Sequence, residues 1–495
     1  MLTVYSFSIE YYKFCALELC YNKCSEVITM NNNGYVATRK EHITYNIFWL
    51  GQNIMWGFVS NYLASYLNMG LGIKADLAAA IFLGPRIWDA INDTIFGYLV
   101  DKYRWKNGQQ FMPWIKIGTF AIGIVGIIMF AIPSTIADIW KIVWFVVAYI
   151  IFDALYTFLD APAFAMSTVM TDNIQERTAF ISGNKLFAML GGVIATVAVG
   201  VFTENFGWLI SAIIFCTVGN LLMIPYLFAG KERRQQLESE KEEKFTYKQM
   251  FSYMKSNKYL FVCLIAFLLF GMTALEQPMS LYVADICFGG KDKQLYIAAC
   301  AALPVILVAL VLPKLTKKYD KFYLLIGGLA FSAIASIVAI FVGYSNMIVA
   351  IILIALKCIG FACWQVIIYM LVADTTEYGT YKSGVRATGI TFSLQTFISK
   401  MNSALVSSIM LFFISLTGYD PNAVLTSDVM TKIWNVFIFV PAIGYILGII
   451  ILVLFYKLRV NDVQIMAKYN NGEISYEEAD AKLSKKFGKP HVKEQ

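Results

Sequence analysis

The most unusual side chains of this sequence lie in its second long apolar segment, which contains Asp89, Asn92 and Asp93. Residues three and four apart share one side of a helix, so the two carboxylates and the amide form one stripe. Asp89 lies roughly 12 residues, or about 18 Å, from either end of the segment, too far for a short side chain to reach water. Ionisable groups at that depth mark sites or pathways by default, so the stripe predicts a functional site within a membrane.

Two like charges one helical turn apart repel each other, so a second cation or a shared proton must accompany them. An ion pair with Arg86 or Lys400 accounts for one carboxylate, but less readily for two carboxylates and Asn92. Hard cations prefer oxygen ligands, whereas desolvation favours protonated carboxylates. Because an amide oxygen helps a metal ion more than a proton, we expect sodium, with a proton or lithium as the alternatives. No other cofactor is expected.

The whole chain has the composition of a membrane protein. Of its 495 residues, 58% are hydrophobic and 15% are charged, whereas soluble domains carry roughly 25% charged residues. A helix that crosses a bilayer needs about 20 apolar residues. Twelve segments qualify, and they are residues 44–68, 76–100, 113–133, 139–168, 180–204, 208–229, 258–283, 292–313, 322–343, 346–372, 387–416 and 431–456. The predicted fold is therefore an all-α membrane protein.

One long charged stretch divides these segments into six and six. The predicted organisation is a cytoplasmic extension (1–43), an N-terminal bundle (44–229), a charged linker (230–257), a C-terminal bundle (258–456) and a cytoplasmic tail (457–495). Residues 1–29 lack the marks of a signal peptide. We expect the chain to start at Met30, with an interfacial segment as the alternative.

Lysine and arginine concentrate in the loops that follow even-numbered segments. Since cytoplasmic loops carry an excess of these residues, both termini are expected in the cytoplasm of a multi-pass protein of the cell membrane. The net charge of +7 sits in these short loops and does not indicate nucleic-acid binding. The expected partners are the lipid bilayer and a small molecule, and no partner protein can be inferred.

The sequence lacks the residues of a membrane enzyme. It has only two histidines, His42 and His491, both outside the apolar segments, and its nine cysteines contain no CxxC pair. No activated serine motif appears either. An enzyme is therefore not expected, and the cysteines are interpreted as small apolar core residues.

Further charges lie within or beside the apolar segments. Each of four such residues, Arg86, Asp153, Glu276 and Asp374, is interpreted either as a structural partner or as a group near the membrane surface. Lys357 is a further charge at membrane depth. Their positions alone do not choose between these interpretations.

The second segment and the loop after it, RIWDAINDTIFGYLVD followed by W-x-x-G-x-x-x-x-PW, resemble the glycoside–pentoside–hexuronide:cation symporters. This family belongs to the major facilitator superfamily. The stretch VADTTEYGTYKSGVRATG at 372–389 supports the resemblance from the other half. The resemblance covers about His42 to about Leu458 and implies the major facilitator fold, with twelve transmembrane helices in two six-helix bundles.

The resemblance also implies specific site residues. The cation, or metal, site corresponds to Asp89, Asn92, Asp93 and Thr157, and the substrate-binding residues to Asn53, Asp160, Phe164, Lys185, Trp364, Gln395 and Thr396. Lys400 corresponds to a lysine that links the charge network to the far half. Asp101, Arg104 and Arg177 are expected to form a cytoplasmic gate, with solvated loop charges as the alternative.

Three positions depart from the melibiose-type pattern. Asn53 stands where those members carry a sugar-binding aspartate, Phe164 where they carry tryptophan, and Lys185 where they carry arginine. Lysine keeps the charge but lacks the planar fork of arginine. We therefore expect a sugar pocket of different selectivity.

The expected function is cation-coupled symport of a glycoside or oligosaccharide into the cell by alternating access. A neutral glycoside is favoured because Asp160 would repel a uronate in a dry pocket. The alternatives are a proton-coupled hexuronide or pentoside symporter and a non-transporting sugar sensor of the same fold.

Overall fold

A computed structural model of the chain describes residues 35–82, 88, 103, 105, 108–171, 173–233, 257–316, 318–384 and 388–491. No strand occurs among these residues. Within them, seven helices are long and apolar enough to cross a membrane by length and composition. The all-α fold is confirmed. The total of twelve spans stays a prediction, since most of segment 76–100 lies outside the described residues. The bounds of the five predicted regions also stay predictions.

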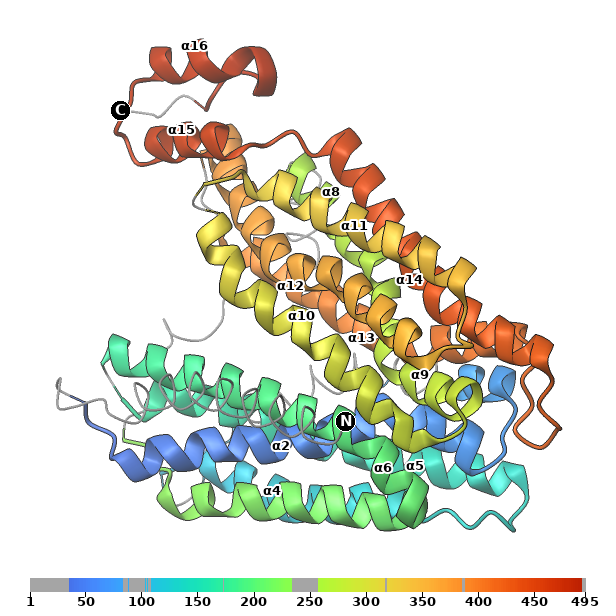
Figure 1. The fold of residues 1–495 in the computed structure, drawn as a ribbon. Coiled ribbons are helices and arrows are strands. Elements are labelled where there is room, and N and C mark those ends of the chain that lie inside the picture. The colour runs from blue at the N-terminus through green and yellow to red at the C-terminus, as the bar shows by residue number, and fades with distance from the viewer. Residues whose placement is uncertain are drawn as a thin grey trace, which may run out of the picture.

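The N-terminal helices form one group, in which α2 packs against α6 (Figure 1). Tyr45, Phe48, Phe58 and Tyr62 of α2 are completely buried there. The helices of this group are α2 (Arg39–Ser65), continued by the π-helix η1 (Tyr66–Gly70), α4 (Met112–Met129), α5 (Asp138–Val169) and α6 (Ile174–Ala229).

Helix α6 consists of two runs that meet at Gly207. This residue has a φ of 74°, a left-handed conformation that glycine adopts without steric cost. Contacts between α6 and the continuous rod of α2 and η1 include Gly183 with Asn46, Ala195 with Gly57, Trp208 with Gly70, and Gly219 with Gly51. The first run is thus parallel to α2 and the second antiparallel. The chain turns back at Gly207, between the predicted segments 180–204 and 208–229.

The C-terminal helices form a second group. The first helical stretch of this group, residues 258–287, is not α-helical throughout. A 3-10 segment and a π-helix flank its short helix α9. The elements are α8 (Lys258–Phe270), η3 (Gly271–Leu275), α9 (Glu276–Tyr282), η4 (Val283–Cys287), η5 (Lys291–Lys293), α10 (Gln294–Leu315), α11 (Lys321–Val342), α12 (Met347–Ser383), α13 (Thr388–Leu416) and α14 (Ser427–Phe455).

Two tail helices, α15 (Val460–Asn470) and α16 (Tyr476–Phe487), lie at one end of the second group (Figure 1). Asn470 Nδ2 donates a hydrogen bond to Glu377 Oε2 at 2.8 Å, and Tyr381 Oη donates to the Gly488 carbonyl at 2.9 Å. The tail is therefore fixed to the end of α12 by side-chain contacts.

The two residues Glu232 and Arg233 fasten the end of α6 to the beginnings of two other helices. Glu232 accepts hydrogen bonds from the backbone N–H groups of residues 110, 111 and 112 at 2.8, 2.9 and 2.6 Å. Arg233 donates to both carboxylate oxygens of Glu41 at 2.9 and 2.7 Å. Burial raises the pKa of Glu41, but the hydrogen bonds from Arg233 and Thr38 outweigh burial and hold that pKa below its ordinary value.

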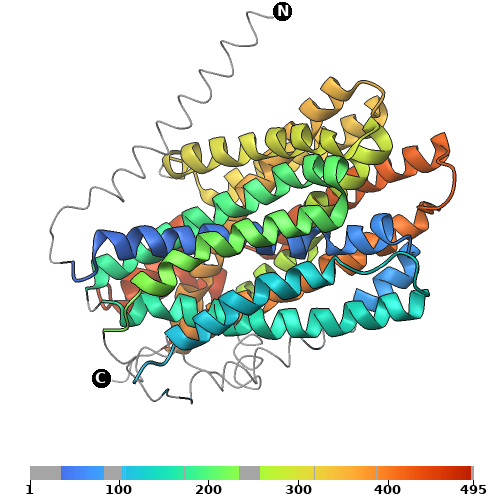
Figure 2. The same cartoon turned by 90° about the horizontal axis from the view of Figure 1, so that it is seen from below.

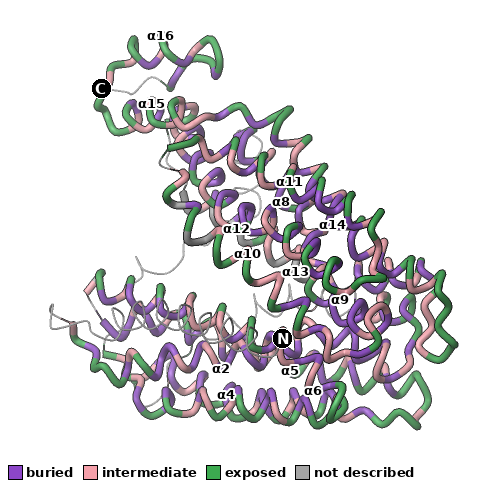
Figure 3. The backbone as a smooth tube through the Cα atoms, in the orientation of Figure 1, coloured by how far each residue is buried: buried purple, intermediate pink, exposed green. Residues whose placement is uncertain are grey.

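The two groups converge at one end and diverge toward the end that carries α15 and α16 (Figure 1). Seen from below, the long helices run in roughly the same direction (Figure 2). Buried residues follow the interiors of both groups, whereas exposed residues follow their outer sides (Figure 3). Large apolar side chains such as Phe228 and Phe341 are among the exposed ones. Such outer surfaces are suited to lipid, as expected for a multi-pass membrane protein.

Candidate functional site

A polar network joins α2 to α5 in the N-terminal group. Gln52 is buried, and its Nε2 donates hydrogen bonds to Asp160 Oδ1 at 2.9 Å and to Tyr156 Oη at 2.8 Å. Asn53 Nδ2 donates to Gln52 Oε1 at 2.6 Å and to the Trp49 carbonyl at 2.9 Å. The structure therefore links Asn53 and Asp160, two of the predicted substrate residues, through one intervening amide.

Tyr156 adds an aromatic surface beside this carboxylate. Its hydroxyl donates to Asp160 Oδ1 at 3.2 Å, and its ring stacks on Trp56 with centroids 3.9 Å apart. The sequence interpretation did not include Gln52, Trp56 or Tyr156. The sequence contained features that could have identified two of them. Gln52 adjoins Asn53, and Tyr156 precedes Asp160 by one helical turn, so it lies on the same side of the helix.

Four candidate side chains follow one another along α5: Asp153, Thr157, Asp160 and Phe164, at the three- and four-residue spacing that keeps them on one side of a helix. Thr157 is buried, and its hydroxyl donates to the Asp153 carbonyl at 3.2 Å. Phe164 is 39% exposed and meets the Trp49 ring edge-on at 6.5 Å. One side of α5 thus carries an aromatic ring, two carboxylates and a hydroxyl.

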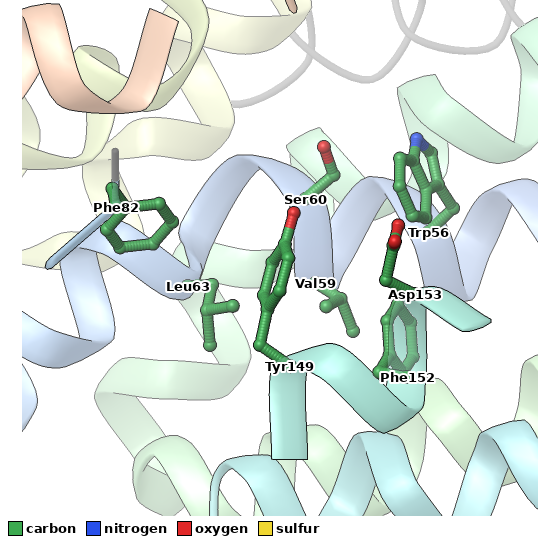
Figure 4. Close-up of a pocket in the computed structure, with 8 residues that line it drawn as sticks. All are labelled: Trp56, Val59, Ser60, Leu63, Phe82, Tyr149, Phe152 and Asp153. Carbon is green, nitrogen blue, oxygen red and sulfur yellow. The ribbon is translucent and has the colours of Figure 1, made fainter. Parts of the chain in front are cut away.

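A small pocket lies between α2 and α5 beside this row (Figure 4). The Asp153 carboxylate lies beside the Trp56 ring, with Tyr149 and Ser60 next to them. The residues that line the pocket are Trp56, Val59, Ser60, Leu63, Phe82, Tyr149, Phe152 and Asp153. Asp153, left open by the sequence as a structural or surface group, is buried at this pocket.

The predicted cation site falls mostly on residues that the structure does not describe. Asp89, Asn92 and Asp93 lie outside the described residues, as do Asp101 and Arg104 of the predicted gate. Thr157 is the described member of the cation set. The pairing of these residues stays a prediction.

The remaining predicted residues are distributed over three helices. Lys185 is exposed on α6, and Arg177 is half-buried near the beginning of that helix. Gln395 of α13 is buried and donates to Ser399 Oγ at 3.0 Å. Thr396 and Lys400 lie on the same helix, but their side chains lie outside the described part of the chain.

Trp364 occupies the core of the C-terminal group. It is 1% exposed, and its ring stacks on Phe270 with centroids 4.0 Å apart. In this conformation Trp364 therefore contributes to packing between α12 and α8.

The α2–α5 network has the chemistry of a site for a polyhydroxylated ligand. A carboxylate accepts hydroxyl hydrogens in charge-assisted bonds, and amides both donate and accept. The Gln52 and Tyr156 contacts hold Asp160 in one orientation, and the Trp56 and Tyr156 rings provide apolar faces nearby.

Most of this chain is similar to known transport proteins. Residues 45–459 match the family described as MFS/sugar transport protein. The isoprimeverose transporter of Lactiplantibacillus pentosus is 24% identical, over 86% of this chain and 90% of that protein. The glucuronide carrier protein homolog of Escherichia coli is also 24% identical, over 84% of this chain and 92% of that protein. The crystal structure of the nucleoside transporter NupG shares the fold, with a TM-score of 0.62 and 12% identity over 84% of this chain and all of that one.

Proposed function

Because this chain belongs to the MFS/sugar transport protein family, we propose that it carries a glycoside or oligosaccharide into the cell together with sodium. Membership makes the protein a multi-pass membrane transporter with the major facilitator fold, and not an enzyme. The sugar, the coupling ion and the direction of transport are the proposal.

The observation that carries the sugar assignment is the network of Asn53, Gln52, Tyr156 and Asp160. Gln52 is buried and bonded to Asp160 and Tyr156, so the carboxylate is pre-oriented before a ligand arrives. Pre-organised polar groups beside aromatic rings are a common arrangement in binding sites for small molecules. The site is expected to read sugar hydroxyls through Asp160 and a pyranose face through Tyr156, Trp56 or Phe164.

Sodium is supported by the donor types in the predicted cation set. Asp89, Asp93, Asn92 and Thr157 would supply oxygen ligands only, as hard cations require. Magnesium and calcium normally take more carboxylate charge or larger ligand shells. A proton or lithium is the alternative coupling ion.

The charge of the sugar follows from Asp160. A uronate would place a second negative charge beside this carboxylate, where repulsion is strong because little water screens it. Lys185 on α6 would have to offset that repulsion, and its side chain is exposed. We therefore favour a neutral glycoside, and a hexuronide or pentoside is the second candidate. One relative is named for isoprimeverose, an uncharged sugar, and another for a glucuronide, a charged one.

The test is a binding and uptake panel on the purified protein. Thermal unfolding is measured with glycosides, pentosides and glucuronides, each with and without sodium, because a ligand that binds the folded state raises its unfolding temperature. The expected result is a shift with a neutral glycoside that grows with sodium, followed by sodium-driven uptake of that sugar into proteoliposomes.

Each other outcome has a defined meaning. A shift that depends on pH but not on sodium would move the coupling to protons. Binding without uptake would make the protein a sensor. A protein that binds none of the sugars would overturn the substrate assignment.

A further inference from the structure

Two opposite charges in the C-terminal group have no part in the proposed function. Lys357 of α12 is completely buried, and its Nζ lies 3.4 Å from Glu276 Oε1. It also donates to the Phe437 carbonyl at 3.3 Å and lies 4.3 Å from the centre of the Phe437 ring. The hydroxyl of Tyr445 in α14 donates to Glu276 Oε1 at 3.2 Å. A buried ion pair often stabilises a fold less than apolar residues of similar size would. A contribution to stability is therefore a poor explanation for the presence of this pair.

The position of Glu276 suggests what the pair does. Glu276 is the first residue of α9, which has only seven residues and lies between the 3-10 segment η3 and the π-helix η4. Changes of helix type interrupt the regular hydrogen-bond ladder and often mark hinges. Because the α-helical hydrogen bonding is interrupted at both ends of α9, its position depends on side-chain contacts with neighbouring helices. Lys357 and Tyr445 provide such contacts from α12 and α14.

Helix α9 also reaches the N-terminal group. Gln277 Nε2 donates to Thr196 Oγ1 of α6 at 2.7 Å, and Tyr282 Oη donates to Asn68 Oδ1 of η1 at 3.0 Å. These contacts lie at the end where the two groups converge, away from α15 and α16 (Figure 1). The residue next to the Glu276–Lys357 pair thus already contacts the opposite bundle.

A third contact passes through α10. Gln294 is buried, and its Nε2 donates both to Ser280 Oγ of α9 at 3.0 Å and to Tyr62 Oη of α2 at 2.7 Å. A small displacement of α9 would therefore disturb three connections between the bundles at once.

The backbone at this end is tightly closed. A Cβ added at Gly200 of α6 would fall well inside contact distance of the Lys291 carbonyl oxygen. A side chain at Gly200 would have to push the two groups apart at this end, and this gives an independent means of opening the contact.

We propose that Glu276 and Lys357 are a positioning pair for the transport cycle. The pair holds α9 in the place from which Gln277, Ser280 and Tyr282 close the outer end between the bundles. The inference rests on the proposed function in requiring that the protein alternates between two openings. It also rests on the predicted cytoplasmic position of both termini, which places the end away from α15 and α16 outside the cell. Loss of the pair should favour the state that is open at this end.

The test measures how accessible this end is to reagents. Ser65, buried near η1, is replaced by cysteine, and its labelling by a membrane-impermeant maleimide is followed from outside the cell. Labelling of the same protein without the Ser65 cysteine is subtracted at each step. No sugar is needed, so the result does not depend on knowing the substrate.

The key variant is E276Q/K357M, in which both residues of the pair are neutral. Neither charge is then left buried without its partner. We expect its labelling to rise about fivefold, because weakening even one or two hydrogen bonds shifts a two-state equilibrium by that factor. G200A should raise labelling in the same direction. The exchange E276K/K357E restores the opposite charges and should return labelling toward the original level. D428N/K432M, which neutralises an exposed pair on α14, is the matched control and should change nothing.

Labelling of E276Q/K357M at the original level would overturn the proposal. So would an exchanged variant that labels as strongly as the neutral one, because the pairing of the charges would then be irrelevant. A normal response to sugars together with unchanged labelling would leave the proposed function standing while this inference fails. The absence of any sugar response together with increased labelling would do the reverse.

Discussion

Neutralising Asp160 should weaken sugar binding while the fold is retained. In the unaltered protein, Gln52 and Tyr156 donate to Asp160 Oδ1 at 2.9 and 3.2 Å. In D160N the amide oxygen can take the place of this acceptor. The internal network is therefore kept in outline. What is lost is the negative charge that strengthens every bond accepted by this side chain.

The magnitude follows from the kind of hydrogen bond involved. Bonds to a charged acceptor contribute about 1.5–3 kcal/mol and neutral ones about 0.5–1.5 kcal/mol, so each sugar hydroxyl loses about 1 kcal/mol. If Asp160 accepts two hydroxyls, the loss is about 2 kcal/mol, or roughly 30-fold in the dissociation constant.

The assay is titration of the purified variant with the sugar identified by the stability panel. D138N is the matched control, because Asp138 lies in the first turn of the same helix, where it pairs with Lys141. Its affinity should stay unchanged. A D160N protein that binds the sugar as tightly as the unaltered one would refute the role of Asp160. A gain in affinity for glucuronides alone would point to the hexuronide alternative.

Three further predictions concern other parts of the chain. E232A removes the acceptor of three backbone N–H groups, so the free energy of unfolding should fall by about 3 kcal/mol, seen as a lower unfolding temperature; an unchanged temperature would contradict this role. The lowered pKa of Glu41 means that its carboxylate stabilises the fold above its ordinary pKa of 4.5 and ceases to do so as the pH falls through the lowered value. The difference in unfolding temperature between the unaltered protein and E41Q should therefore be full at pH 7 and shrink in acid, and a difference that grows on acidification would disprove the sign. D93N should bind sugar without the sodium effect, and full sodium dependence in its uptake would remove Asp93 from the cation site.

Much of the architecture was predictable because the relevant signals are local. A segment that crosses lipid must satisfy its own backbone hydrogen bonds and is therefore helical, and its side chains must suit an apolar environment. Each membrane segment can thus be recognised as a run of apolar residues. The reversal at Gly207 falls in the short interval between two such runs. The family resemblance came from the contiguous motif around Asp89, of which the described residues include Trp88 but not Asp89, Asn92 or Asp93.

The site was only partly predictable. Asn53 and Asp160 were singled out one by one, but the sequence did not show that Gln52 joins them, since Gln52 and Asp160 are 108 residues apart. Trp364 was expected in the substrate site, and the structure places its ring in the core against Phe270. An aromatic residue on a buried helix has no local feature that distinguishes these two surroundings.

The sequence by itself determined an all-helical membrane protein, its family and the residue types available for binding a cation and a sugar. Only the tertiary structure decided which of those residues meet, that Glu276 faces Lys357, and that α9 bridges the two bundles at one end. The reason is physical. Helix formation in lipid depends on neighbours along the chain, whereas the environment of each polar group depends on which distant helix lies against it.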